Sequence, residues 1–335
     1  MEHKRQGQYS GVICVLRKEM NMAIIGYSEN TWSSGNVITS TKLNNIEDGI
    51  LACSDLLDAT NTNTLYYASG NHNGIFRGKN LTSVYTVAEL HSMISAGTFD
   101  DLYIGDYYSM SQTATIDDTD ITETVYWVFA GFDCFWGYGS TACTTHHAVM
   151  VPLNSFKTTA AMNSTATTGT NSDDTVGAYL GSDMWLTVLP AYATAIQNAW
   201  GSSYVLTHQQ YLSSTMTSTT SSMAGAGYTG ASTAATWTDV TCSLMNEAMV
   251  FGTTVCSSSR FDNEYANQFP LFQLAPHYRR ASVGGGSTHS ASSRNAWWLS
   301  CVASSTTFCG VSTNGSPTAG SASNLYGVRP YFLLS

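Results

Sequence analysis

The stretch that decides the fold is residues 294–335, which read RNAWWLSCVASSTTFCGVSTNGSPTAGSASNLYGVRPYFLLS. Two adjacent tryptophans, Trp297 and Trp298, come near its start, and a run of small polar residues follows. Neighbouring side chains on a strand point to opposite faces, so at least one of the two rings is predicted to lie in the core. Burial of such a ring contributes about 2–3 kcal/mol. We therefore expect strands that the tryptophans hold in the fold.

A second rigid segment, Gly327-Val328-Arg329-Pro330, lies near the end of this stretch. Glycine permits a tight turn, valine favours a strand, and proline fits the edge of a sheet or a bulge. Arg329 is predicted to pair inside the fold and to order the final strand. We therefore assign scaffold roles to this segment, as to the tryptophans.

Between the two rigid segments, Ser300–Asn324 consists largely of Ser, Thr, Asn and Gly. Such small, adaptable side chains resemble the composition of antibody loops, and binding sites are commonly built from loop residues on a rigid scaffold. The stretch is therefore predicted to be a ligand-binding surface whose identity is free to vary; the alternative is a plain surface loop. The candidate contact residues, with Trp297 and Tyr326 as aromatic anchors, are Asn295, Trp297, Ser300, Val302, Ser304, Ser305, Thr307, Cys309, Ser312, Asn314, Ser316, Asn324 and Tyr326.

The composition of the whole chain fits a β-rich, loop-rich binding protein. Of its 335 residues, 43% are hydrophobic and 12% aromatic, enough to bury a sizeable core. Charged residues make up only 11%, well below the roughly 25% of an average soluble domain. The formal net charge is −10 and no basic stripe is visible, which argues against a nucleic-acid partner. No apolar run reaches the roughly 18 residues of a membrane span, so membrane insertion is not expected.

The 8 cysteines form no Cys-x-x-Cys pair, so the sequence does not support a zinc ribbon or a redox motif. A chain of this length can form a core without disulfides. Because no secretion signal is visible, free thiols are favoured over disulfide bridges.

No catalytic or metal-binding constellation stands out in the sequence. His146 and His147 are adjacent, so on a strand they point to opposite faces and do not easily bind one ion. The acidic segment 117–120 lacks the glycine and the terminal glutamate of an EF-hand loop, and we interpret it as a hydrated turn. There is no Gly-x-Ser-x-Gly motif, and nothing in the sequence places a cysteine beside a histidine. We expect no catalytic residues, no metal and no cofactor.

The first 21 residues differ from the rest and hold four of the 13 basic residues. The triplet Arg17-Lys18-Glu19 can be encoded by a ribosome-binding sequence, and Met22 follows at a normal initiation distance. One interpretation is that translation begins at Met22 and that residues 1–21 are upstream sequence. The alternative is a disordered N-terminal tail.

Residues 22–64 are expected to form a separate N-terminal segment for oligomerisation. Within them, residues 36–60 read as a helix with candidate N-caps at 39–41. The helix carries an apolar stripe. This stripe either packs on its own domain or forms a short parallel bundle between chains, and two heptads alone would barely stabilise such a bundle. A polar linker, Thr60–Thr64, follows. The stripe occupies heptad positions a and d and consists of Leu43, Ile46, Ile50, Cys53 and Leu57.

From Leu65 onward, strands and helices mix without strict alternation, which favours an α+β fold. Polar loops are expected at 163–177 and, as a mobile low-complexity loop, at 213–237. The expected helices are Val87–Ser95 with a stop at Gly97, 181–201 with a kink or break at Pro190, a turn or short helix at the end of 236–252, and a short helix in 263–276 that runs into Pro270. The expected strands are Leu102–Tyr108, 123–137, 146–153, the start of 236–252, Trp297–Val302, Thr307–Val311 and Gly327–Leu334.

Six phrases of the second part occur in a recognisable order: GAYLGSDM, LMNEAMVFG, QFPLF, WWLSCV, VSTNGSPT and YGVRPYFLL. Together they resemble a domain family of undescribed function that is common in phages and gut bacteria. Its usual pattern is Gly-Gly-Tyr-x-Gly-Ser-Asp-Met, then Glu-x-Glu-x-Phe-Gly, Tyr-Trp-Leu-Arg-Ser and Gly-Val-Arg-Pro. That family looks like a C-type-lectin-like fold and is similar to the variable proteins of diversity-generating retroelements, including the tropism determinant at phage tail-fibre tips. The resemblance covers about residues 65–335.

The chain departs from this pattern at two places. Where the family has Trp-Leu-Arg-Ser, the chain has Trp298-Leu299-Ser300-Cys301, and in Asn246-Glu247-Ala248-Met249 only one acidic residue remains. Altered residues beside intact ones are what a diversified surface would show. The segment ITSTKLNNIEDGI also resembles the opening of phage tail and fibre proteins.

The resemblance implies a phage virion protein of the tail-fibre type, made in the bacterial cytoplasm and carried on the virion. Residues 65–335 would form a C-type-lectin-like ligand-binding domain with a variable region at about 294–326. It would bind a bacterial surface protein or glycan, as an oligomer that could be a trimer and that joins virion proteins through the N-terminal segment. One alternative is a structural or decoration protein of the virion without a receptor role. The other is an enzyme related to formylglycine-generating enzymes, which use paired cysteines; Cys301 and Cys309 would be the corresponding pair in this chain.

Overall fold

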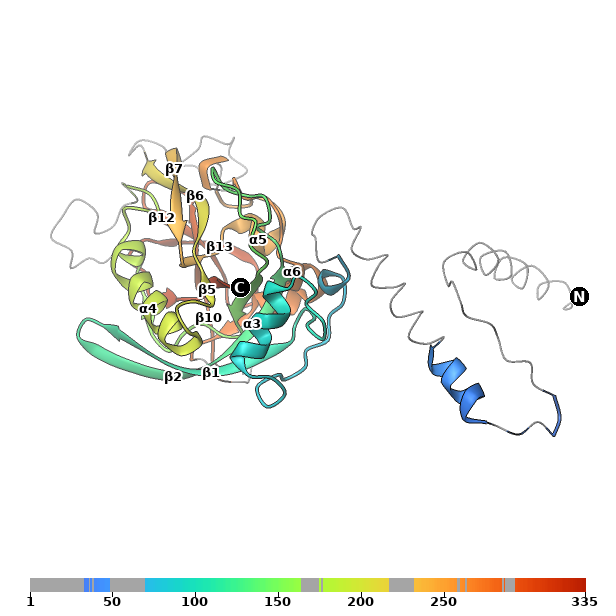
Figure 1. Cartoon of the computed structure of the whole chain (residues 1–335). Coiled ribbons are helices and arrows are strands. Elements are labelled where there is room, and N and C mark those ends of the chain that lie inside the picture. The colour runs from blue at the N-terminus through green and yellow to red at the C-terminus, as the bar shows by residue number, and fades with distance from the viewer. Residues whose placement is uncertain are drawn as a thin grey trace, which may run out of the picture. The chain divides into compact units, whose positions relative to one another are not determined.

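A computed structural model describes residues 33–35, 37, 39–48, 70–163, 175, 177–216, 232–257, 260–262, 264–284, 286 and 293–335 (Figure 1). The chain divides into two compact units, Met1–Tyr66 and Tyr67–Ser335. The boundary between them falls two residues after the end of the polar linker. The two interpretations of residues 1–21 and the heptad positions after residue 48 lie outside the described residues.

In the first unit, residues 40–48 form a helix. The Thr39 hydroxyl accepts a hydrogen bond from the backbone N–H of Lys42 at 3.3 Å, which is the contact of an N-cap residue. Leu43 and Ile46, the first two members of the predicted stripe, are 49% and 38% exposed. The described part of the stripe is therefore an open apolar face.

The second unit is mixed α+β and consists mostly of strands, as predicted. Its helical segments are η1 Gly70–Asn73, α3 Val87–Ser95, the π-helix η2 Met184–Val188, α4 Leu189–Trp200, α5 Glu247–Phe251, η3 Arg260–Asp262, α6 Pro270–Leu274 and η4 Pro276–Arg279. Its strands are β1 Tyr107–Ile116, β2 Thr119–Phe132, β3 Ala148–Pro152, β4 Thr159–Ala160, β5 Val205–Leu206, β6 His208–Met216, β7 Ser232–Val240, β8 Cys242–Leu244, β9 Ala281–Ser282, β10 Arg294–Asn295, β11 Trp297–Val302, β12 Thr307–Val311, β13 Pro317–Ser321, β14 Tyr326–Gly327 and β15 Pro330–Leu334.

The main sheet has six strands in the order β1-β2-β3-β15-β5, with β8 also paired to β15, and all its pairs are antiparallel. The strand β15 comes after all the others in the sequence but lies in the interior of this sheet. The long hairpin β1–β2 forms one border and curves along the second unit (Figure 1). The turn between β1 and β2 uses Asp117 and Asp118 at φ 48° and 58°, the backbone conformation of a two-residue hairpin loop.

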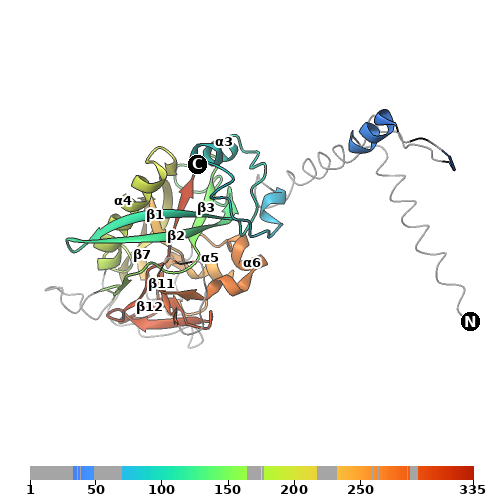
Figure 2. The ribbon, with the colours of Figure 1, turned by 90° about the horizontal axis from the view of Figure 1, so that it is seen from below.

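A second sheet carries most of the C-terminal stretch, in the order β13-β12-β11-β14-β4. Figure 2 shows β11 and β12 at the end of the unit away from α3. A separate hairpin, β6–β7, pairs antiparallel from His208 to Met216. The core between the main sheet and α4 is aromatic: the Trp127 ring meets Phe332 edge-on at 4.8 Å, and Trp200 of α4 lies 5.6 Å from the same ring.

The structure confirms Val87–Ser95, whose N-cap Thr86 forms a capping box with Glu89. The strands Trp297–Val302 and Thr307–Val311 have the predicted bounds. The predicted kink in residues 181–201 is a change from π-helix to α-helix, with Pro190 in the first turn of α4, where its missing N–H costs nothing.

Several predicted elements were wrong in their limits. The strand at Leu102–Tyr108 begins only at Tyr107, and the helix in 263–276 begins rather than ends at Pro270, because proline fits the first turn of a helix. The predicted single strand Gly327–Leu334 is two strands in different sheets. The two ends of the predicted loop 213–237 belong to β6 and β7, and β13 was missed because Pro, Ala and Gly, three of its five residues, are weak strand formers.

Candidate ligand-binding site

Both tryptophans of the C-terminal stretch are fully buried. The indole N–H of Trp297 donates to the carbonyl of Arg279 at 2.8 Å, and that of Trp298 donates to the carbonyl of Ala160 at 2.8 Å. The Trp298 ring also stacks on Tyr326, with ring centroids 4.3 Å apart. The scaffold role predicted for the pair is therefore confirmed.

Arg329 is also fully buried, as predicted, and its partners are carbonyl oxygens. Its guanidinium donates to Pro152 at 2.9 Å, Tyr278 at 2.7 Å and Leu153 at 3.1 Å, and it lies 4.9 Å from the centroid of the Trp297 ring. Burial lowers the pKa of the guanidinium to about 9, so it stays charged at neutral pH. The residue ties β15 to the segment after β3 and to η4.

The roles predicted for Gly327 and Pro330 need correction. Gly327 has no positive φ; a Cβ there would lie 2.5 Å from the Ser155 hydroxyl, so close packing rather than a turn requires glycine. Pro330 lies in a central strand, opposite Leu244, and not at an edge or a bulge. It is the first residue of that strand, where a missing N–H is tolerated.

Five of the thirteen candidate contact residues are buried and do not reach the surface in this structure. The strand β11 is buried along its whole length, because β8, α5 and η3 cover it. Its alternate side chains therefore point into two covered faces, which sequence alternation alone does not reveal. The buried candidates are Trp297, Ser300, Val302, Ser304 and Cys309.

The other eight candidates are at least partly exposed, and six of them fall into two groups. The strands β12 and β13 pair from Thr307↔Ser321 to Val311↔Pro317, which separates their two ends by roughly 13 Å. Ser305, Thr307 and Asn324 lie toward one end, and Ser312, Asn314 and Ser316 form the loop at the other. Asn295 lies on β10 outside both groups, and the half-buried Tyr326 covers Gly310 and Gly320 between them.

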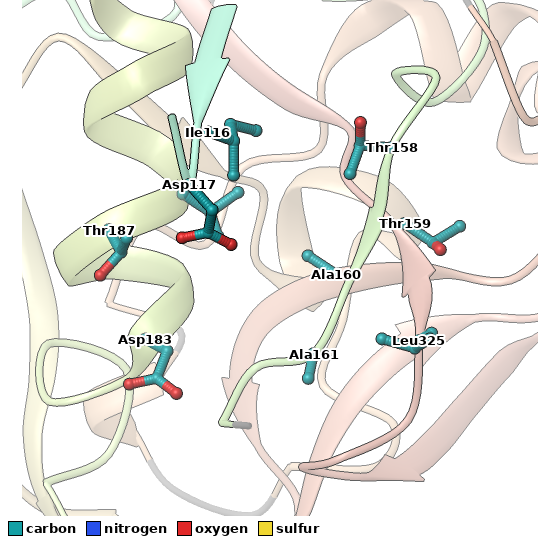
Figure 3. Close-up of a pocket in the computed structure, with 10 residues that line it drawn as sticks. Ile116, Asp117, Thr158, Thr159, Ala160, Ala161, Asp183, Thr187 and Leu325 are labelled. Atoms are coloured by element: carbon teal, nitrogen blue, oxygen red, sulfur yellow. The ribbon is translucent and has the colours of Figure 1, made fainter. Parts of the chain in front are cut away.

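A pocket of about 510 Å³ lies beside the first group, next to the exposed Leu325. Figure 3 shows Asp117, Asp183 and Thr187 on one side of it and the segment of Thr158 to Ala161 on the other. The hairpin turn and the start of the π-helix thus supply two carboxylates, and no basic residue lines the pocket. Its lining consists of Ile116, Asp117, Thr158, Thr159, Ala160, Ala161, Asp183, Thr187, Val188 and Leu325.

Sequence reasoning missed this pocket. Asp117 was assigned to a hydrated turn, and Asp183 was noticed only within a resembling motif. No periodic pattern connects residues 116, 158, 183 and 325, since the fold alone brings them together. Leu325, which is 65% exposed between two polar neighbours, is the one signal the sequence offered.

The structure brings Cys143 to 3.9 Å from Nδ1 of His147, a pairing that the sequence did not predict. This histidine is fully buried; its Nδ1 lies 2.8 Å from the carbonyl of Thr145, and its Nε2 accepts the N–H of Phe135 at 3.0 Å. Nδ1 therefore carries the proton and cannot take one from the thiol. Burial lowers the pKa of His147 and raises that of Cys143, which opposes a thiolate–imidazolium pair.

Cys301 and Cys309 are fully buried thiols, which agrees with the predicted preference for thiols. Burial raises the pKa of both groups. Beside them, Glu247 accepts backbone hydrogen bonds from residues 255, 256 and 257 and the hydroxyl of Ser257, which fixes the loop after α5. The arrangement is that of a structural cluster rather than an exposed redox pair.

Within the described residues, no group of three or more His, Cys, Asp and Glu side chains could hold a metal ion. In the same part of the chain, no helix is both long and apolar enough to span a membrane. His146 pairs with Asp133 at 2.8 Å, and the backbone N–H of His147 donates to the same carboxylate at 2.9 Å. The carboxylate of Asp133 therefore holds both histidines in place.

No family model matches the chain, and comparisons with curated proteins and with solved structures find no match. Function must therefore be argued from the geometry of the site.

Proposed function

We propose that this protein is a phage virion protein of the tail-fibre type whose second unit is a C-type-lectin-like domain. It binds a protein or glycan on the bacterial surface through the exposed side chains around β12 and β13 and through the pocket beside Leu325. The combination of mixed short strands, few helices and long connections supports this type of fold.

The observation that carries the proposal is the contrast between buried and exposed residues within one stretch. Trp297, Trp298 and Arg329 are fully buried and hydrogen-bonded, whereas Asn314, Ser316 and Asn324 are exposed. Substitution of an exposed Asn or Ser leaves the buried contacts intact. A surface of this kind can change its specificity without loss of the fold.

The charge of this surface limits the ligand. Among residues 293–335, only Arg294 and Arg329 carry charged side chains, and Arg329 is buried. The pocket adds two carboxylates and no base. The exposed Arg280 lies at the loop of Ser312, Asn314 and Ser316 and donates to the Asn314 carbonyl at 3.3 Å. The pocket therefore favours a neutral or cationic ligand, whereas the loop at the other end of β12 and β13 also presents a cation.

The helix of the first unit supports self-association. If Leu43 occupies heptad position a and Ile46 position d, then Glu47 falls at position e of the same heptad and Lys42 at position g of the preceding one. In parallel helices, g of one chain meets e of its neighbour, so Lys42 and Glu47 have complementary charges between identical chains. An in-register parallel oligomer would multiply weak single-site binding by avidity.

The test uses the full chain. Fluorescently labelled protein is bound to candidate host cells and measured by flow cytometry, with Leu325→Ala and Asn324→Ala as site variants and the exposed Phe76→Ala as control. Loss of binding in the site variants alone supports the receptor role. Equal binding by all variants, or no binding to cells on which the phage grows, contradicts the receptor role.

Sequencing of the gene across a phage population separates the receptor role from the second candidate. Variation concentrated at the exposed residues of 295–324, with Trp298, Gly327 and Arg329 fixed, supports a diversified receptor-binding surface. Uniformly low variation favours a decoration protein of the virion.

A further inference from the structure

The hairpin β6–β7 presents an outward face that the proposed receptor site does not use. Its strands pair Gln209 with Asp239 and Tyr211 with Trp237. Residues two apart on a strand share a face, so these four side chains lie together, with about 7 Å between the two pairs. The alternate residues of β6, His208 and Gln210, are buried and therefore mark the inner face. The opposite face, which carries Trp237, is the outer one.

The aromatic residues of this face form a small cluster of their own. The Trp237 ring lies 5.2 Å from Tyr211 and 5.3 Å from Tyr138, and Tyr211 lies 6.5 Å from Phe261. All four rings are partly exposed. Half-buried rings with exposed area and a polar edge are typical contacts for a ligand.

A polar pocket of about 380 Å³ adjoins the Gln209–Asp239 pair. Gln209 organises its wall: its amide oxygen accepts the Ser140 hydroxyl at 2.6 Å and the N–H of Thr141 at 3.0 Å, and its amide nitrogen donates to Oδ1 of Asp239 at 3.3 Å. The exposed Asp239 keeps its other carboxylate oxygen for an outside donor. Four threonines, Thr141, Thr144, Thr145 and Thr207, line the remainder of the pocket together with Ala142, Cys143, Leu206 and His208.

We propose that this face is a carbohydrate-binding site for a neutral sugar. The C–H face of a pyranose ring packs on Trp237 and Tyr211, and its hydroxyl groups donate to Asp239 and exchange hydrogen bonds with the threonines. The site lies on a different hairpin from the surface around β12 and β13. The proposal of a sugar site is therefore independent of the proposed receptor role.

The chemistry of the pocket selects this class of ligand. A carboxylate and several hydroxyls match a ligand that carries many hydroxyl groups, whereas a largely apolar ligand would leave them without partners. Among the described residues, no Lys or Arg lines the pocket, so an anionic sugar or a phosphate would meet the Asp239 charge uncompensated. The adjoining rings supply the apolar contact that hydroxyl groups alone do not give.

The test measures binding of defined probes to the full chain. Methyl glycosides of glucose, galactose, mannose and N-acetylglucosamine, and their disaccharides, are titrated by saturation-transfer NMR and tryptophan fluorescence. Trp237→Ala is expected to weaken binding at least about tenfold. Asp239→Asn, at an exposed position that leaves folding intact, is expected to weaken it about fivefold, because a charge-assisted hydrogen bond is lost.

Matched controls are Phe76→Ala, an exposed aromatic elsewhere, and Asp120→Asn, an exposed carboxylate on β2 that lines neither pocket. Both controls should bind the sugars as the wild type does. Three results overturn the proposal: no probe binds at about 10 mM, binding is unchanged in Trp237→Ala and Asp239→Asn, or all four variants lose binding equally. The receptor role is tested separately, by cell binding of Leu325→Ala and Asn324→Ala.

Discussion

Replacement of Asp262 by Asn should remove a large part of the pH dependence of stability. Asp262 is buried; its Oδ1 accepts the Ser232 hydroxyl at 2.9 Å and the N–H of Val302 at 3.2 Å, and so joins the start of β7 to the end of β11. Its other oxygen, Oδ2, has no hydrogen-bond partner in the described residues. Burial raises the pKa of Asp262 from 3.8 to about 7, because the charged form loses its hydration.

The sign of the effect follows from proton binding. The folded state holds the proton up to about pH 7, whereas the unfolded state releases it near pH 4, so this group stabilises the fold at low pH and loses its contribution as the pH rises. With the two pKa values of 3.8 and about 7, the contribution falls by roughly 2–3 kcal/mol between pH 5 and pH 8. The amide side chain of the Asp262→Asn variant cannot titrate, so that variant should not show this loss.

The assay is urea unfolding of the wild type and Asp262→Asn at pH 5 and pH 8, with the exposed Asp120→Asn as control. The difference in unfolding free energy between wild type and Asp262→Asn should shift by roughly 2–3 kcal/mol between the two pH values, with the wild type losing stability. Contributions from other titrating groups are common to both proteins and cancel. An equal pH dependence in the two proteins would refute the assignment of a buried, protonated Asp262.

Three further predictions concern the scaffold and the helix of the first unit. Gly327→Ala should lower the unfolding free energy by about 1–3 kcal/mol in denaturant titrations, since its Cβ would meet Ser155, whereas Gly286→Ala, with open space around it, should not. Arg329→Met should cost about 3–5 kcal/mol, because three carbonyls lose their donor; unchanged thermal stability would contradict this role. Reversal of Lys42 to Glu should weaken self-association in sedimentation measurements, and the double reversal with Glu47→Lys should restore it; no rescue would exclude an in-register parallel arrangement.

Local chemistry made several elements predictable from the sequence. The capping box at Thr86 and Glu89 fixed the start of Val87–Ser95, and β-branched and aromatic residues marked the strand that begins at Trp297. Predicted helix boundaries were wrong where a proline is compatible with either end of a helix. Pro270, for example, could follow the end of one helix or lie in the first turn of the next. The division after Gly327 depends on which sheet offers a partner, and that information is not local.

The candidate site was harder to predict because exposure depends on what covers a strand. Ser300 and Cys309 have the composition of a variable surface, yet β8, α5 and neighbouring strands cover them. The burial of Trp298 and Arg329 was predictable, since a large ring and a lone cation in a polar run need a specific environment. The pocket beside Leu325 and the outward face of β6–β7 join segments that are remote in sequence, and only the fold brings them together.

The position of β15 determines when the second unit can fold during synthesis. This strand completes the main sheet between β3 and β5, yet the ribosome makes it after every other strand. Until residues 330–334 have left the exit tunnel, β3, β5 and β8 lack their shared neighbour, and the apolar side chains that β15 covers face water. The nascent chain must therefore wait in an incomplete state, in which exposed strand edges favour aggregation. We therefore expect that truncation of the final strand lowers the yield of soluble protein and that chaperones raise the yield of the full chain.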